Sequence, residues 1–438
     1  MQNAPGSDVS LLTVEFERGA DGAPMTEGFI AILGKDTNAV DRDGLALVDL
    51  AGGRAARALR IGGETAVESP TWDFAAGETL TVQAAFPRVT TSTIDVVVPG
   101  IDLVRVPVVE AGAETWPEAV RGWASATDTV GEFGALVHSA VSLVTQSEVE
   151  VAGDKVLVEL PSDVLFATAK HALSAKAQKV VDEAGAKIAT AAAATGEITV
   201  TGHTDDVGTD ADNQALSERR AAAVADRLRP ILGSGFTIRT VGKGETDPKV
   251  TGVSDEKRAL NRRVEIEFTG ATASKMVIID DVPTELPPTE GDVVTGAGPA
   301  RVPDLMDNTG LEARMVSLQR EDGHIVGVLE VSATGERAHT SMFFGDGLKV
   351  VGGDRWERGL LSIRNFSLLT PTSRVFASTF HAGDDEEARP VGSRGQSLLP
   401  VKGGAARFVV VWPDTDPTAT TVTVDAPGYY RFVDVPIS

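Results

Sequence analysis

Short runs of Val, Leu and Thr, separated by turn residues, fill residues 8–110. Residues 80–86 and 93–98 are two such runs, and Pro99-Gly100 marks a turn directly after the second. Short strands bounded by frequent turn signals are typical of an all-β sandwich. The pattern therefore predicts a β-sandwich domain over residues 1–114.

Residues 305–438 show the same pattern and resemble the first block in the order of their features. Phe86-Pro87 precedes a Thr-rich run and a strand that ends in Pro99-Gly100, and Trp412-Pro413 precedes a Thr-rich run and a strand that ends in Pro427-Gly428. We interpret the second block as a related β-sandwich. Chance similarity between two Val/Thr-rich regions is the alternative explanation.

The spacing of apolar positions changes between the two blocks. Residues 115–146 have a loose helical periodicity, interrupted by glycines, which predicts a helical connector over residues 115–148. Residues 149–270 then alternate strand and helix patterns, which indicates an α/β unit. Its expected elements are a hairpin around Gly153-Asp154, helices over 168–194 and 212–232, and strands over 197–201, 236–241 and 263–268.

Proline, glycine and acidic residues dominate residues 271–304, which predicts a semi-extended linker. The predicted fold is thus an α+β multidomain protein with one all-β sandwich on each side of a central α/β domain. The length of 438 residues fits about three domains at ~150 residues each.

Composition excludes several kinds of function. The net charge of −23 disfavours nucleic acid as a partner, because phosphate backbones repel an acidic chain. The absence of cysteine removes disulfides, thiolate catalysis and cysteinyl metal sites. We find no apolar run long enough to span a bilayer and no signal peptide. The protein is therefore expected to be cytoplasmic, or exported by a signal outside this sequence.

Candidate binding chemistry lies where a predicted strand gives way to a helix. Thr204 and Asp205 follow the strand over 197–201, and Arg220 lies inside the helix that begins near residue 212. A loop beside a helix start offers free backbone N–H groups. Asp205 suits an ammonium group and Arg220 suits a carboxylate. A ligand that carries both charges on one carbon, such as an end of diaminopimelate, would satisfy both.

These residues belong to motifs that resemble the OmpA-like C-terminal domain, the family of OmpA, Pal and MotB. The motifs are Thr-Gly-His-Thr-Asp-Asp-Val-Gly at 201–208, Asn-Gln-Ala-Leu-Ser-Glu-Arg-Arg-Ala at 213–221 and Asn-Arg-Arg-Val-Glu-Ile at 261–266. The resemblance covers about residues 149–269. It implies a βαβαββ fold and non-covalent binding of the peptidoglycan stem peptide through its diamino acid.

The resemblance also implies roles for single residues. Asp205 and Arg220 would be the two charged grips, and Asn213 would add contacts beside the helix start. Arg262 or Arg263 would border the pocket, and only one of them can do so because neighbouring strand residues point to opposite faces. The sequence does not determine which diamino acid is preferred.

Simpler interpretations remain open for each feature. Asp205 alone could cap a turn. The acidic residues of the loop lack the spacing of an EF-hand, and the scattered histidines lack metal-ligand spacing, so no metal and no cofactor is predicted. No nucleophile is accompanied by a base.

We therefore predict a non-catalytic, extracytoplasmic protein of the bacterial cell envelope whose sandwiches contact envelope proteins or stiffen the assembly. The alternatives are a wall hydrolase or other enzyme with an unrecognised site in a sandwich, and a structural or adhesive scaffold with a degenerate OmpA-like pocket.

Overall fold

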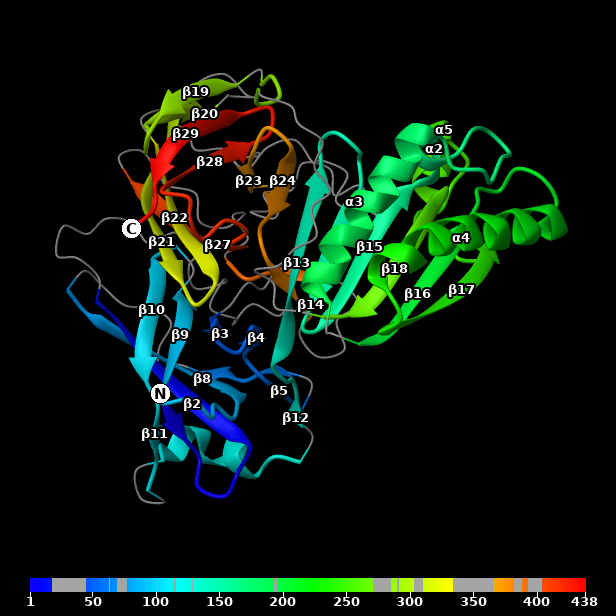
Figure 1. The fold of residues 1–438 in the computed structure, drawn as a ribbon. Helices are drawn as coiled ribbons and strands as arrows, with labels where there is room; N and C mark the ends of the chain where they lie inside the picture. Colours follow the sequence, from blue (N-terminus) through cyan, green and yellow to red (C-terminus); the bar gives the residue numbers. More distant parts are fainter. Residues whose placement is uncertain are drawn as a thin grey trace.

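The central α/β module of the computed structural model follows the expected order of elements (Figure 1). The structure describes residues 1–17, 45–62, 64–68, 77–98, 100–112, 116–127, 129–192, 195–270, 285–289, 291–302, 310–333, 366–381, 388–392 and 404–438. The module consists of β14 (Glu148–Ala152), β15 (Lys155–Pro161), α2 (Ser162–Leu165), α3 (Ala175–Ala191), β16 (Gly196–His203), α4 (Asp210–Leu232), β17 (Phe236–Gly244), α5 (Asp255–Asn261) and β18 (Arg263–Thr269). From β15 onward, its strands and two long helices follow the βαβαββ order.

The module's sheet has the strand order β14-β15-β18-β16-β17. The expected hairpin at Gly153-Asp154 is confirmed, because Ala152 pairs with Lys155 across a two-residue turn. The helices α3 and α4 cover one face of this sheet (Figure 1). Their buried positions, which include Val181, Ile188 and Leu228, pack on the alternating apolar residues of the strands.

Local caps fix the helix boundaries beside the candidate site. The Thr209 side chain accepts a hydrogen bond from the backbone N–H of Asp212 at 3.1 Å, which caps α4. At the other end, α4 stops at Gly233, whose φ of 74° is a conformation that glycine adopts without strain. Ser174 caps α3 through the backbone N–H of Ala177 at 3.1 Å. The helix α3 therefore begins at Ala175 instead of residue 168, and α4 begins at Asp210 instead of residue 212.

The predicted helical connector over residues 115–148 is wrong for most of its length. Residues 118–125 form a short 3₁₀ helix, but β13 (Gly134–Ser142) is a nine-residue strand with alternating buried positions. The strand is favoured because it satisfies the backbone groups of several neighbouring edges at once. It pairs with β14, with β24 (Ser373–Phe376), with β25 (Thr379–Phe380) and with β4 (Arg54–Arg57).

This pairing makes β13 a continuous link between the module and both β regions. Figure 1 shows β13 as a long strand that runs between the module and the flanking β structure. At Gly134 the chain passes so close to the opposing segment that a Cβ would lie 2.0 Å from the backbone oxygen of His381. The module is therefore joined to the rest of the protein by sheet hydrogen bonds as well as by chain connectivity.

The amino-terminal β region has two larger sheets and one small one. One sheet contains β11 (Val109–Glu110), β1 (Gln2–Asn3), β2 (Val9–Glu17), β8 (Thr79–Pro87) and β7 (Val67–Glu68). The second contains β4, β3 (Ala46–Asp49), β9 (Thr93–Val98) and β10 (Asp102–Pro107). The small sheet contains β12 (Thr129–Val130), β5 (Arg60–Ile61) and β6 (Glu64–Thr65).

The carboxy-terminal β region has a corresponding arrangement. One sheet contains β20 (Ala300–Val302), β21 (Leu311–Glu321), β22 (His324–Ala333) and β27 (Ala405–Pro413). The other strands are β24, β23 (Ser367–Leu369), β28 (Thr421–Ala426), β29 (Tyr430–Pro436) and β19 (Asp292–Thr295), with β25 and β26 (Arg389–Pro390) beside them. Residues 291–302 of the predicted linker thus contribute β19 and β20, because β29 and β21 offer them free edges.

The two β regions pair their strands in the same order. The hairpin β3–β4 pairs with β9, as the hairpin β23–β24 pairs with β28. The strands β2 and β8 pair as β22 and β27 do, and β9–β10 corresponds to β28–β29. The turns after β9 and β28 both contain a glycine with positive φ, 79° at Gly100 and 78° at Gly428. These correspondences follow the features that suggested a repeat.

The two β regions do not stand apart as the predicted flanking sandwiches would. A single buried cluster joins Phe86 and Val96 of the first region to Leu329, Trp412 and Phe432 of the second. Figure 1 shows β9 and β10 directly beneath β21, β22 and β27. Apolar faces too large to leave in water are buried against each other. Among the helices that the structure describes, none has the length and apolar character needed to cross a bilayer.

Candidate functional site

The candidate site lies at one edge of the module's sheet. The strands β15 and β16 end at this edge, and the antiparallel β18 begins there, since Pro161 pairs with Arg263 and Gly202 pairs with Val264. The backbone N–H of Thr204 donates to the Gly244 oxygen at 2.9 Å, which holds the loop after β16 against the end of β17. Loops that leave all of these strands therefore converge on one place.

Asp205 is held by the arginine that caps α5 and by a backbone N–H of its own loop. Its Oδ2 accepts a hydrogen bond from Arg262 Nη1 at 2.7 Å, and its Oδ1 accepts one from the backbone N–H of Val207 at 3.3 Å. The side chain is 14% exposed, so the carboxylate can still be reached from solvent. The turn-capping role and a ligand-binding role are compatible for this residue.

Arg220 reaches the same region from α4 and is almost completely buried, with 3% of its surface exposed. Its Nε donates to the backbone oxygen of Lys170 at 3.1 Å, and its guanidinium lies over the ring of Phe166, with Cζ 5.2 Å from the ring centroid. Within the described part of the chain, neither Nη atom has a hydrogen-bond acceptor, and the guanidinium forms no ion pair. Its terminal N–H groups are therefore available to an acceptor from outside the chain.

The electrostatic environment places Arg220 and Asp205 in one site. Burial lowers the pKa of Arg220, while the nearby carboxylates of Asp163 and Asp205 raise it and Arg262 lowers it. Asp205 does not bond to Arg220 directly, because its carboxylate is engaged by Arg262. The site thus combines a buried cation, Arg220, with a partly exposed anion, Asp205, that is also bonded to a second cation, Arg262.

Asn213 connects the first turn of α4 to two loops. Its Nδ2 donates to Glu245 Oε2 at 2.6 Å and to the backbone oxygen of Asp205 at 3.3 Å. The side chain is 5% exposed. Asn213 therefore fixes the position of Asp205 through the backbone of the loop. The hydroxyl of Thr204 is buried and has no hydrogen-bond partner in the described chain.

Arg262 directly precedes β18 and Arg263 is its first residue, and their side chains reach different partners. Arg262 borders the pocket and donates to Asp163 from Nε at 2.9 Å and from Nη2 at 2.7 Å. Arg263 lies away from the pocket, where its Nη2 is 2.7 Å from Glu265 Oε1. Burial opposes ionisation of Glu265, but His203 and Arg263 outweigh it and lower the pKa of this carboxyl to about 2. The structure therefore separates Arg263 from the other candidate residues.

Sequence reasoning missed Asp163, Phe166 and Glu245. Asp163 follows β15 as Asp205 follows β16, and both strands flank β18. An acidic residue directly after a predicted strand is the sequence signal that points to Asp163. It could not be used, because the sequence did not give the order of the strands in the sheet. The acidic loop residues Asp206 and Asp212 are bonded to Arg258 and to Thr209.

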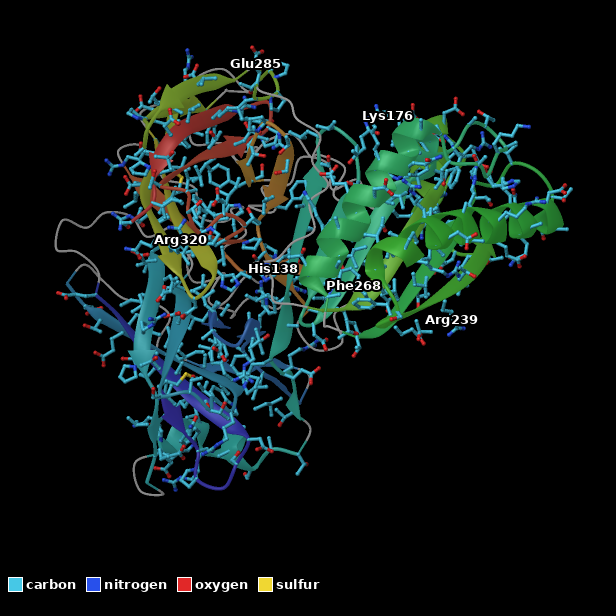
Figure 2. The ribbon with its side chains drawn as sticks, viewed as in Figure 1. His138, Lys176, Arg239, Phe268, Glu285 and Arg320 are labelled. Carbon is cyan, nitrogen blue, oxygen red and sulfur yellow. The ribbon has the colours of Figure 1, made fainter. Side chains whose placement is uncertain are left out.

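A serine–histidine pair occurs away from this pocket, where β13 passes the carboxy-terminal β region (Figure 2). His138 Nδ1 lies 2.8 Å from Ser378 Oγ, and the ring of His324 lies 5.2 Å from that of His138. His138 and Ser378 are 3% and 1% exposed. A nucleophile must be reached by its substrate, so this geometry suits packing between the strands.

Comparison with known proteins places residues 165–262 in the OmpA family. Outer membrane porin F of Pseudomonas aeruginosa is 56% identical over 70 residues, which are 16% of this chain and 20% of that protein. Outer membrane protein A of Serratia odorifera is 38% identical over 124 residues, which are 26% of this chain and 51% of that protein. The chain thus spans about half or less of these relatives.

Two solved structures are each similar to less than a third of the chain. The cell wall anchor of the T6SS from Pseudomonas aeruginosa is 32% identical, with 29% of this chain and 90% of that chain covered and a TM-score of 0.26. The peptidoglycan-associated lipoprotein from Burkholderia pseudomallei is 25% identical, with 24% and 86% covered and a TM-score of 0.20. The chain therefore contains an OmpA-family domain at residues 165–262, and the relatives and structures named here each match less than a third of the chain.

Proposed function

We propose that this protein binds the stem peptide of peptidoglycan through the pocket formed by Asp205 and Arg220. The observation that carries the proposal is Arg220, a nearly buried guanidinium that has Nη donors without an acceptor in the described chain. A buried charge is costly unless a partner compensates it. A carboxylate of the ligand would provide that partner in two-point geometry.

Asp205 provides the complementary charge. Its partly exposed carboxylate can accept an ammonium group that sits on the same carbon as the carboxylate bound by Arg220. The amino-acid end of diaminopimelate has this arrangement. The buried hydroxyl of Thr204 adds a polar group without a protein partner next to Asp205. A cell wall anchor and a peptidoglycan-associated lipoprotein are among the similar proteins, which is in keeping with a ligand in the cell wall.

Binding to peptidoglycan places the protein in the cell envelope, outside the cytoplasm, as a non-catalytic component. The β regions then present their surfaces to other envelope proteins, and β13 holds them in a fixed orientation to the wall-binding module. Sheet pairing on both sides of β13 would let the module transmit force to the β regions. An adhesive or scaffolding role of these regions follows from this arrangement.

Co-sedimentation with purified sacculi tests the proposal. Wild-type protein is compared with Arg220→Ala, Asp205→Ala and the matched control Arg219→Ala, which removes an exposed arginine from the adjacent position of α4. Removing either charge of the pocket leaves its ligand partner uncompensated and should cost about 2–5 kcal/mol of binding. Free diaminopimelate should release the bound wild-type protein. Equal pelleting of all four proteins would reject the proposed function.

A further inference from the structure

Arg262 bonds to two carboxylates at the edge of the candidate site, and the number of hydrogen bonds differs between them. Two of its nitrogens donate to both oxygens of Asp163, at 2.9 and 2.7 Å. One nitrogen, Nη1, donates to a single oxygen of Asp205 at 2.7 Å. A two-point guanidinium–carboxylate pair is stronger and more directional than a one-point pair. Arg262 is therefore anchored on Asp163 and reaches Asp205 with its remaining end.

We propose that Asp163 and Arg262 determine the selectivity of the pocket for a head group that carries both an ammonium and a carboxylate, over a plain amine. This inference rests on the proposed binding of a diamino acid at Asp205 and Arg220. Asp163 is the positioning residue, because it keeps Arg262 in place when an ammonium group takes over the Asp205 oxygen. Neither residue was assigned this role by its sequence position.

The charges of the pocket support this selectivity. Asp163 and Asp205 supply two negative charges, and Arg220 and Arg262 supply two positive charges, so the four groups are balanced. A head group with both charges keeps the balance and gives Arg220 an acceptor. A plain ammonium group adds a positive charge beside two guanidinium groups and leaves Arg220 without an acceptor, which is unfavourable in a buried site.

Loss of Arg262 should change this preference in a defined direction. Without its positive charge the remaining groups carry an excess negative charge, which favours a plain amine. Loss of the Asp163 charge should act differently, because Arg262 then keeps only Asp205 as a carboxylate partner and competes there with the ammonium group of the ligand. The two substitutions thus distinguish the effect of the charge of Arg262 on ligand preference from the effect of its position.

A neighbouring ion pair provides the control. Arg258 donates to Asp206 from Nε at 2.6 Å and from Nη2 at 3.2 Å, so this pair has the same two-point form as Arg262 and Asp163. Asp206 directly follows Asp205, but Arg258 does not bond to the Asp205 carboxylate. Asp206→Asn therefore removes an equal charge from the same loop without releasing Arg262.

Titration calorimetry on the full chain tests the inference with two probes of matched length. meso-Diaminopimelate carries two zwitterionic ends, and 1,5-diaminopentane has the same separation of nitrogens without the carboxylates. Arg262→Gln should reduce the preference for diaminopimelate at least about tenfold, the equivalent of one charged hydrogen bond. Asp163→Asn should weaken diaminopimelate binding by about tenfold, and Asp206→Asn should stay within about twofold of wild type.

The outcomes separate this inference from the proposed function. If Arg262→Gln keeps the wild-type ratio of the two affinities, or if Asp163→Asn matches Asp206→Asn, the selectivity role is overturned while the binding function stands. If wild-type protein and Arg220→Ala bind diaminopimelate equally, or neither binds it, the binding function and this inference are both rejected. Circular dichroism of each variant checks that the fold is retained.

Discussion

A buried cluster of charges on the opposite face of the module's sheet makes stability depend on pH. Lys249 forms ion pairs with both Glu148 and Glu159, and its side chain is 8% exposed. Burial raises the pKa of Glu148 from its ordinary value of 4.5 to about 7, with Lys249 lowering it and Glu159 raising it. Arg263, whose Nε is 3.9 Å from Glu159 Oε1, also pairs with Glu265, so these two cations face three carboxylates. An excess negative charge therefore remains in a poorly solvated place.

Replacing Glu148 by Gln should therefore stabilise the module at high pH. A folded pKa above the unfolded value means that protonated Glu148 contributes stability below pH 4.5, and that this contribution is lost as the pH rises through about 7. Each unit of difference between the folded and unfolded pKa corresponds to about 1.4 kcal/mol in the free energy of unfolding. Because the two carboxyls share one lysine, we expect Glu148→Gln to gain about 1–3 kcal/mol at pH 8 and almost nothing at pH 4.5.

Hydrogen exchange of the amides in β14 and β15 measures this effect where it arises, since a chain with several structural units does not unfold in a single step. Glu267→Gln is the matched control, because Glu267 is an exposed carboxylate on the same face of the sheet. Lys249→Met should lower the opening free energy at pH 8 by about 3–5 kcal/mol, because Glu148 then lacks its cation and Glu159 keeps only the 3.9 Å ion pair with Arg263. The reasoning is refuted if Glu148→Gln does not increase protection more at pH 8 than at pH 4.5.

Three further substitutions test the packing of the module and its connection to the β regions. Ile266→Ala removes a fully buried side chain from the middle of β18 and should lower the free energy of unfolding, measured by hydrogen exchange, by about 3 kcal/mol. A loss of less than about 1 kcal/mol would contradict close packing there. Gly202→Ala places a Cβ 2.3 Å from a backbone oxygen of α4 and should lower both the melting temperature and sacculus binding, whereas Gly196→Ala, with nothing within 4 Å, should change neither. Gly134→Ala places a Cβ 2.0 Å from a facing backbone oxygen and should make β13 sensitive to proteolysis, whereas Gly122→Ala, also in open space, should not, and equal sensitivity would argue against the shared sheet.

Local signals in the sequence were sufficient for most of the central module. The alternation around Gly153-Asp154 predicted a hairpin that the structure contains, because a two-residue turn and its strands are close in sequence. The apolar periodicity of α3 and α4 predicted both helices for the same reason. The three motifs identified the OmpA-family domain, and they placed Asp205 and Arg220 on a loop and a helix that share one electrostatic environment.

Tertiary contacts decided the features that local patterns left open or described wrongly. Residues 134–142 have apolar positions that fit a helix or a strand, and the free edges of β14, β24 and β4 made the strand more favourable. Alternation along a strand predicted that only one of Arg262 and Arg263 borders the site. The fold selected Arg262, because it lies directly before β18, where Asp163 and Asp205 accept its hydrogen bonds. Asp163 joined the site because the ends of strands distant in sequence meet at one sheet edge. The sequence by itself determined the elements and the charged groups available to them, whereas the neighbours that satisfy backbone bonds and bury apolar faces determined where each group points.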